Sequence, residues 1–439
     1  MAKRWTAANF WEPPTSISKD EMVKISEALL TEPDIEFTET EDVFRIRANE
    51  MDWDIGCMVY EPTDPSKAAV GPDGKKLGII MTHGGASDWR SIERLAQTFT
   101  GKRGYKVCSM TYPGRLYLPD SSRDWPDDTF HADGSVRTPI WLEGEHISSD
   151  EYDVIKDTSF REIYGSRSYA RAKKGSNFYY RMAAWPVAFE EGMRDICRRY
   201  LPVGEYSIFA HGHSTGGPFA HMLLQRVENI KGLIGIENSP FAFIYRKMAG
   251  HDWPTPFNYM LIRTWRELAR YKGAEIAMLE GKKPLFRLAW LMEEIFEMWN
   301  EAKRFPQFKT ENWFHLDSIP CLTEAAKVTA ERIGMNTEET QALVDRYIGY
   351  GRPLTGPDAK SVPPLMYCIN KFSRDHTPEK YKILQAEYAA MDPAPKVRVI
   401  ELGTGIHSYW KSEERLPLGV CPVVTKVWHD AIMNGYYEV

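Results

Sequence analysis

One stretch of the chain, residues 206–227, limits the possible folds more than any other. It opens with the apolar run Tyr-Ser-Ile-Phe-Ala, whose β-branched and aromatic residues favour a buried strand. The sequence Gly-His-Ser-Thr-Gly follows at positions 212–216, and apolar residues then recur at helical spacing. A chain that passes from strand to helix in so few residues must turn sharply, which glycine tolerates best. We therefore predict a strand, a tight turn at Ser214 and a helix.

The predicted turn has a chemical consequence for Ser214. Strained backbone would leave its hydroxyl projecting above the sheet edge, and the amide of Thr215 would lie at a helix N-terminus, where negative charge is favoured. The stretch resembles the nucleophile elbow of the α/β-hydrolase superfamily, in its Gly-His-Ser-x-Gly-Gly form. An ordinary glycine turn is the alternative interpretation.

The resemblance implies an α/β-hydrolase fold: a mostly parallel central sheet, helices on both faces and a helical cap insertion. Short apolar runs supply the strands that such a sheet needs, at residues 77–82, 105–111, 231–237, 362–369 and 396–402. Alternation over residues 42–61 predicts two antiparallel strands that turn near Asn49 and Glu50. Helices are expected at residues 19–30, 176–201 and 420–433.

We divide the chain into a core and one insertion. Residues 1–240 and 361–439 form the predicted hydrolase core, with an N-terminal arm and an excursion at 116–175 that is too long for a simple connection. Helical spacing recurs at residues 259–279, 284–304 and 322–348. Many α/β-hydrolases carry a helical cap after the strand that corresponds to 231–237, so we assign 241–360 to a cap.

A serine hydroxyl is a weak nucleophile and needs a neutral imidazole within hydrogen-bond reach. His407 lies in Gly-Thr-Gly-Ile-His-Ser, directly after the last predicted strand. The superfamily places its base after the last strand and keeps the order serine, acid, histidine. The resemblance therefore implies that His407 is the base, and His376 and His429 are the alternative candidates.

The acid has two candidates. Most of the superfamily takes its carboxylate from just after the strand that follows the cap, and Asp375 lies there, several residues late. Glu237 ends the preceding strand, and a subset of bacterial esterases uses a glutamate at that place, with a strand end that Ile-Gly-Ile-Glu-Asn-Ser-Pro resembles. We favour Glu237 and keep Asp375 as the alternative.

The oxyanion of an acyl-transfer reaction needs backbone N–H donors. The strand at 77–82 runs into His-Gly-Gly-Ala, and in this superfamily such a segment aims an amide at the substrate carbonyl oxygen. By resemblance the two donors are the amides of Gly85 and Thr215, with Ala86 as an alternative to Gly85.

Composition argues against several other functions. The net charge of the 439 residues is −6, and no basic stripe with interleaved aromatics suggests a nucleic-acid partner. The six cysteines are scattered and predict free thiols, and no ligand spacing or phosphate-binding loop predicts a metal or another cofactor. No secretory signal and no apolar run of about 18 residues is visible, so we expect a cytoplasmic protein without a membrane partner.

Together these features predict a serine hydrolase. A carboxylic ester hydrolase that acts on a small-molecule ester through an acyl-enzyme on Ser214 is the leading hypothesis, and homo-oligomers are possible. The same residues could instead cleave a carbon–carbon, amide or thioester bond, because fold and triad do not fix the substrate. A hydrolase-like binding protein with an idle elbow is the alternative from another class.

Overall fold

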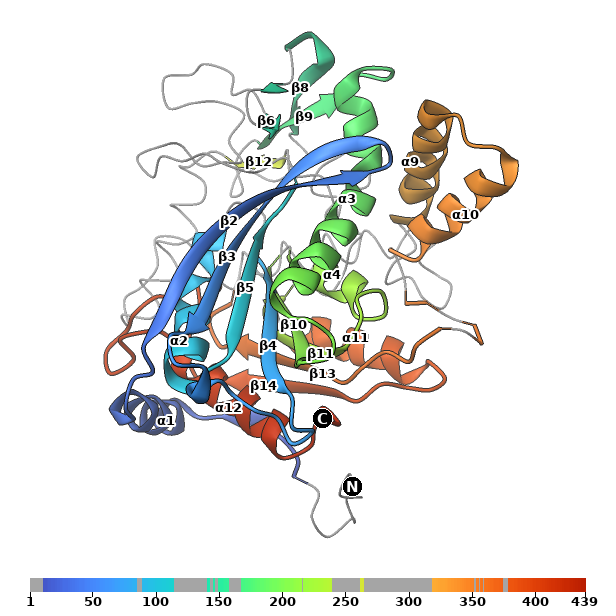
Figure 1. The fold of residues 1–439 in the computed structure, drawn as a ribbon. Coiled ribbons are helices and arrows are strands. Elements are labelled where there is room, and N and C mark those ends of the chain that lie inside the picture. Colours follow the sequence, from blue (N-terminus) through green and yellow to red (C-terminus); the bar gives the residue numbers. More distant parts are fainter. Residues whose placement is uncertain are drawn as a thin grey trace.

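A mixed sheet of nine strands organises the described part of the computed structural model (Figure 1). The structure describes residues 11–84, 89–113, 140–142, 145–146, 149–157, 167–214, 216–238, 261–263, 318–350, 353–354, 356–357, 359–373 and 378–439. In spatial order the strands are β1 (Ser16–Ile17), β14 (Val397–Leu402), β13 (Leu365–Asn370), β11 (Ile230–Asn238), β10 (Tyr206–Ser214), β4 (Lys76–Thr82), β5 (Lys106–Thr111), β3 (Met51–Pro62) and β2 (Phe37–Ala48).

Most of this sheet is parallel. The pairs from β1 to β5 all run in one direction, and only β3 with β5 and β2 with β3 are antiparallel. The carboxyl ends of β4, β10, β11, β13 and β14 therefore meet at one edge, where α/β sheets bind their ligands. Every core strand expected from the apolar runs is present, within three residues of its predicted bounds.

The hairpin at the far edge also follows the sequence pattern. β2 and β3 pair along their whole length and turn at Asn49 and Glu50, as predicted. Both turn residues have positive φ, 46° and 59°, which is the backbone of a two-residue hairpin turn whose twist matches the strands.

Helices cover both faces of the sheet, which confirms the predicted fold class. Their bounds are α1 (Lys19–Thr31), α2 (Glu93–Arg103), α3 (Asn177–Tyr200), α4 (Gly216–Leu223), α9 (Ser318–Ile333), α10 (Thr337–Ile348), α11 (Pro378–Ala389) and α12 (Cys421–Met433). Single turns of 3₁₀ helix are η2 (Pro65–Lys67), η3 (Trp89–Ser91) and η4 (Ser149–Glu151). α3, α4, α9, α10 and α11 contribute to the core on one face, and α1, α2 and α12 to the core on the other.

Local capping explains where several helices begin. Ser18 caps α1 and Glu21 returns the bond to the Ser18 amide, a reciprocal capping box. Ser176 caps α3 by a single bond, in which its hydroxyl accepts from the amide of Tyr179.

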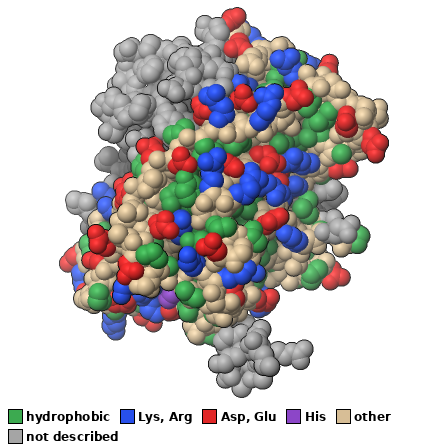
Figure 2. Space-filling model, viewed as in Figure 1, with side chains coloured by type: hydrophobic (Ala, Val, Ile, Leu, Met, Phe, Trp, Pro, Cys, Tyr) green, Lys and Arg blue, Asp and Glu red, His purple; other side chains and the backbone are tan. Residues whose placement is uncertain are grey.

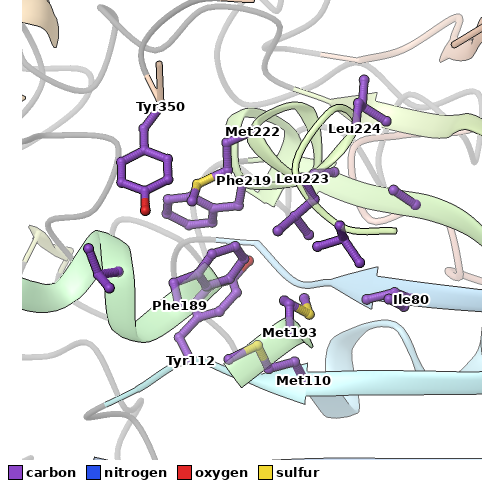
Figure 3. Close-up of a cluster of buried hydrophobic side chains, with 14 of the residues drawn as sticks. Ile80, Met110, Tyr112, Phe189, Met193, Phe219, Met222, Leu223, Leu224 and Tyr350 are labelled. Carbon is purple, nitrogen blue, oxygen red and sulfur yellow. The ribbon is translucent and has the colours of Figure 1, made fainter. Parts of the chain in front are cut away.

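The core beside the predicted elbow is aromatic. Phe189 of α3, Phe219 of α4 and Tyr112 after β5 form a triangle of ring contacts with centroids 5.0–5.6 Å apart, shown in Figure 3. Met193 of α3 lies beside them in the same view. Because α4 packs through this cluster onto α3, the helix that follows Ser214 is held firmly against the sheet.

Two helical predictions in the insertion need correction. The expected helix at 322–348 is two helices, because Gly334 takes a left-handed φ of 73° and Asn336 starts α10 with a capping box to Glu339. Residues Leu261–Arg263 form the strand β12, not helix, and pair with β9 (Arg167–Ala172). Most of 241–317 lies outside the described residues, so the cap stays a prediction.

The excursion at 116–175 contains short strands where it is described. β9 pairs with β8 (Tyr152–Asp157), and β6 (Ile140–Leu142) pairs with β7 (Glu145–His146). With β12, the strands β8 and β9 form a three-stranded antiparallel sheet, and β6 with β7 forms a two-stranded one, both separate from the nine-stranded sheet.

A buried carboxylate fastens α10 to α3. Glu190 of α3 is 2% exposed, and its Oε2 accepts bonds from Arg346 Nη2 at 2.9 Å and from the Tyr350 hydroxyl. Arg194 donates to Oε1 at 2.8 Å. Burial alone would raise the pKa of Glu190, but Arg346 and the other donors hold that pKa below its usual value.

The surface in the view of Figure 1 mixes acidic and basic side chains (Figure 2). Along the edge strand β2, Glu39 and Glu41 precede Arg45 and Arg47, and charged side chains discourage a second sheet from pairing with such an edge. No helix in the described ranges is long and apolar enough to cross a membrane.

Candidate active site

Ser214 ends β10 in a backbone conformation that few residues adopt. Its φ is 52°, and the pairing of β10 with β11 shifts register there. The flanking glycines are required by close approach: a Cβ at Gly212 would lie 2.6 Å from the carbonyl oxygen of Gly216, and one at Gly216 would lie 2.5 Å from that of His83. The strand passes into α4 within two residues, so Ser214 occupies the sharp turn that its sequence predicts.

The end of β4 packs directly against this turn. The hydroxyl of Thr82 lies 3.0 Å from the carbonyl oxygen of His211 and 2.8 Å from that of Gly216. A Cβ at Gly84 would lie 3.2 Å from His213 Nδ1 and 3.3 Å from Ser214 Cβ, so a larger residue there would press on the serine turn. The predicted oxyanion donors, Gly85 or Ala86 and Thr215, lie outside the described residues.

His407 lies in the loop that follows β14, and its side chain is buried. The loop reaches this position through Gly405, whose φ of 93° is in the region that favours glycine. The His407 ring centroid lies 4.9 Å from that of His213, the residue before Ser214. His213 Nε2 donates to the carbonyl oxygen of His407 at 3.1 Å. These contacts join the histidine loop to the turn that carries the serine.

Glu237 lies next to last in β11 and faces His407. His407 Nδ1 donates to Glu237 Oε2 at 3.2 Å, and the Glu237 side chain is 0% exposed. The φ of Glu237 is 53°, so the backbone leaves regular strand geometry at the residue that carries the carboxylate. Because Nδ1 carries the shared proton, Nε2 of His407 is left as the acceptor, which is the tautomer a general base needs.

Two further donors satisfy the buried carboxylate. The amide of Asn370 donates to Glu237 Oε1 at 2.8 Å, and the Ser373 hydroxyl donates to Oε2 at 2.5 Å. An ionised carboxylate is costly to bury unless it is hydrogen-bonded. Sequence reasoning missed both partners. The signal that could have found them is the polar run that begins at the end of β13 with Asn370.

Of the alternative candidates for the acid and the base, the structure describes only His429. Asp375 and His376 lie outside the described residues. His429 lies on α12, where its Nδ1 is 3.1 Å from the Tyr105 hydroxyl, and burial lowers its pKa to about 4.

Two other histidines near the elbow are buried and neutral. Burial lowers the pKa of His211 to about 4, and its Nδ1 donates to the carbonyl oxygen of Ile234. His221 of α4 lies between the hydroxyls of Tyr388 and Tyr367, at 2.7 Å and 2.9 Å, and burial lowers its pKa to about 3. The His211 ring lies against Trp428 of α12, with centroids 5.9 Å apart, and the His221 ring belongs to the packing between α4, β13 and α11.

Among the described residues, no group of three or more His, Cys, Asp or Glu side chains could hold a metal ion. Cys57, Cys108, Cys197, Cys368 and Cys421 are buried free thiols. Burial raises the pKa of the Cys197 and Cys368 thiols well above the usual value, so neither is suited to act as a thiolate.

Comparison with known proteins gives matches of structure only. No family model matches the sequence. No curated protein matches it. Acylaminoacyl peptidase from Pyrococcus horikoshii matches at 11% identity and a TM-score of 0.39, over 94% of this chain and 44% of the peptidase, so this chain spans less than half of the peptidase's length.

Two solved structures of more similar length also match. Vibralactone cyclase matches at 11% identity and a TM-score of 0.39, over 98% of this chain and 94% of that chain. Esterase 2 from Thermogutta terrifontis matches at 9% identity and a TM-score of 0.37, over 89% of this chain and 92% of that chain. By its strand order and its helices on both faces, the chain has the α/β-hydrolase fold.

Proposed function

We propose that the protein is a serine hydrolase and that its substrates are carboxylic esters of small molecules. One observation carries the proposal: a buried histidine–glutamate pair lies beside the strained turn that presents Ser214. A buried imidazole bonded to a carboxylate on one nitrogen is built to take a proton on the other. Ser214, on the neighbouring turn, is the hydroxyl that such a base would serve.

The proposed reaction has two halves. Ser214 Oγ attacks the substrate carbonyl carbon while His407 Nε2 takes the hydroxyl proton, and the tetrahedral intermediate forms. His407 then gives that proton to the leaving alcohol as the carbon–oxygen bond breaks. A water molecule attacks the acyl-enzyme by the same route and restores Ser214. Glu237 stabilises the imidazolium throughout without taking its proton.

Backbone amides complete the proposed site. The N–H groups of Gly85 and Thr215 would hold the oxyanion, as the resemblance to the superfamily implies. The close approach of Gly84 to Ser214 supports this assignment, because Gly84 is the residue directly before Gly85. The alternative substrates are amides, thioesters and compounds with a cleavable carbon–carbon bond, because the same serine, histidine and glutamate could act on each of them.

Turnover on a substrate panel tests this function. We expect the purified protein to hydrolyse members of a series of p-nitrophenyl esters, and Ser214→Ala to lower kcat/KM at least about a thousandfold. Ser109→Ala, which removes a buried hydroxyl in β5, is the matched control and should keep full activity. Faster cleavage of matched amides or thioesters would change the substrate class. Full activity of Ser214→Ala would refute the mechanism.

A further inference from the structure

A four-residue turn at the end of β13 contacts Glu237 and the loop that carries His407. The turn runs from Asn370 to Ser373 and is closed by the Ser373 amide, which donates to the carbonyl oxygen of Asn370 at 3.1 Å. Ser373 is 3% exposed, so its hydroxyl is sheltered from bulk water.

On one side the turn binds the carboxylate. The Asn370 amide reaches Oε1 of Glu237, and the Ser373 hydroxyl reaches Oε2. Oε2 is the same oxygen that accepts the Nδ1 proton of His407. The two carboxylate oxygens are therefore distinguished by their partners, and the backbone amide together with the serine hydroxyl fixes which oxygen faces the imidazole.

On the other side the turn binds the histidine loop. The Asn370 side chain donates to the carbonyl oxygen of Ile406 at 2.7 Å, and the Phe372 amide donates to that of Gly405 at 3.0 Å. Both acceptors lie one or two residues before His407. One turn thus sets the distance between the carboxylate and the imidazole loop.

We propose that Ser373 is a positioning residue of the hydrolase, acting through Glu237. The inference rests on the proposed function. The terminal torsion of a glutamate is soft, so a carboxylate keeps one orientation only where hydrogen bonds fix it. The Asn370 amide restrains Oε1, and the Ser373 hydroxyl restrains Oε2 in the direction of Nδ1. Without that hydroxyl the carboxylate can rotate, and His407 is less well held when it becomes an imidazolium.

Kinetics of Ser373 variants test the role. We expect Ser373→Ala to lower kcat on the order of tenfold with KM little changed, since a hydrogen bond to a charged group is lost and substrate contacts are kept. Ser373→Cys fills nearly the same space with a weak donor, so it should lose kcat as Ser373→Ala does. Ser109→Ala should lose nothing, because three strands separate β5 from β13.

A double-mutant cycle with Glu237→Gln separates positioning from a general loss of packing. If Ser373 acts through Glu237, then adding Ser373→Ala to Glu237→Gln should lower kcat by less than about twofold. Multiplied losses, or a Ser373→Cys variant as active as wild type, would overturn the inference. Failure of the proposed function is distinguishable, because it would leave the wild-type protein itself inactive on the ester panel.

Discussion

At the scale of single residues, the candidate site depends on contacts between side chains at the ends of different strands. The serine turn is encoded locally, in five consecutive residues, so its sequence was sufficient to predict it. The partnership of Glu237 with His407 joins residues 170 positions apart. The sequence offered two carboxylates. The structure places Glu237 against the imidazole of His407, and Asp375 lies outside the described residues.

The role of Glu237 makes a direct prediction. Glu237→Gln should lower kcat by a factor on the order of thousands with little change in KM, because the imidazole loses its orientation and the partner of its charge. Steady-state kinetics on the best ester of the panel measures both constants. Asp375→Asn is the matched control and should change kcat only slightly. The opposite pattern, a large loss in Asp375→Asn alone, would assign the acid to Asp375.

At the scale of elements, strands were easier to predict than helices. Each core strand is an apolar run between polar stretches, and such a pattern reliably predicts a short buried strand. Helical spacing is ambiguous where it covers a break or a short strand, as at Gly334 and at Leu261–Arg263. The helix α11 has no sequence prediction, although its buried face carries Tyr381, Leu384 and Tyr388.

The fastening of α10 to α3 predicts a loss of stability. Glu190→Gln should lower the free energy of unfolding by about 3 kcal/mol, because Arg226 would keep a buried charge without this carboxylate and Arg346 would be left with Glu191 alone. Glu191→Gln is the matched control on the same helix. Its carboxylate is partly exposed and pairs with Arg346, so the cost should stay below about 1 kcal/mol. Urea unfolding measures both, and equal losses would contradict the role of burial.

At the scale of the whole molecule, contacts between residues far apart in the sequence form structure that the local sequence pattern does not predict. β1 has only two residues and no pattern of its own, yet it extends the sheet beside β14. The Gly403 amide donates to the carbonyl oxygen of Ile17 at 2.8 Å, just before the His407 loop. Such a strand forms because an edge is available to it, which the sequence alone does not show.

The central claim is that Ser214 is a nucleophile activated by His407, and covalent labelling tests it most directly. Incubation with a fluorophosphonate, followed by intact mass measurement and peptide mapping, should give one adduct per chain, on Ser214. Ser214→Ala should give none, and His407→Ala should react far more slowly because the hydroxyl has lost its base. Absence of an adduct from the folded wild-type protein, or an adduct on another residue, would contradict the account.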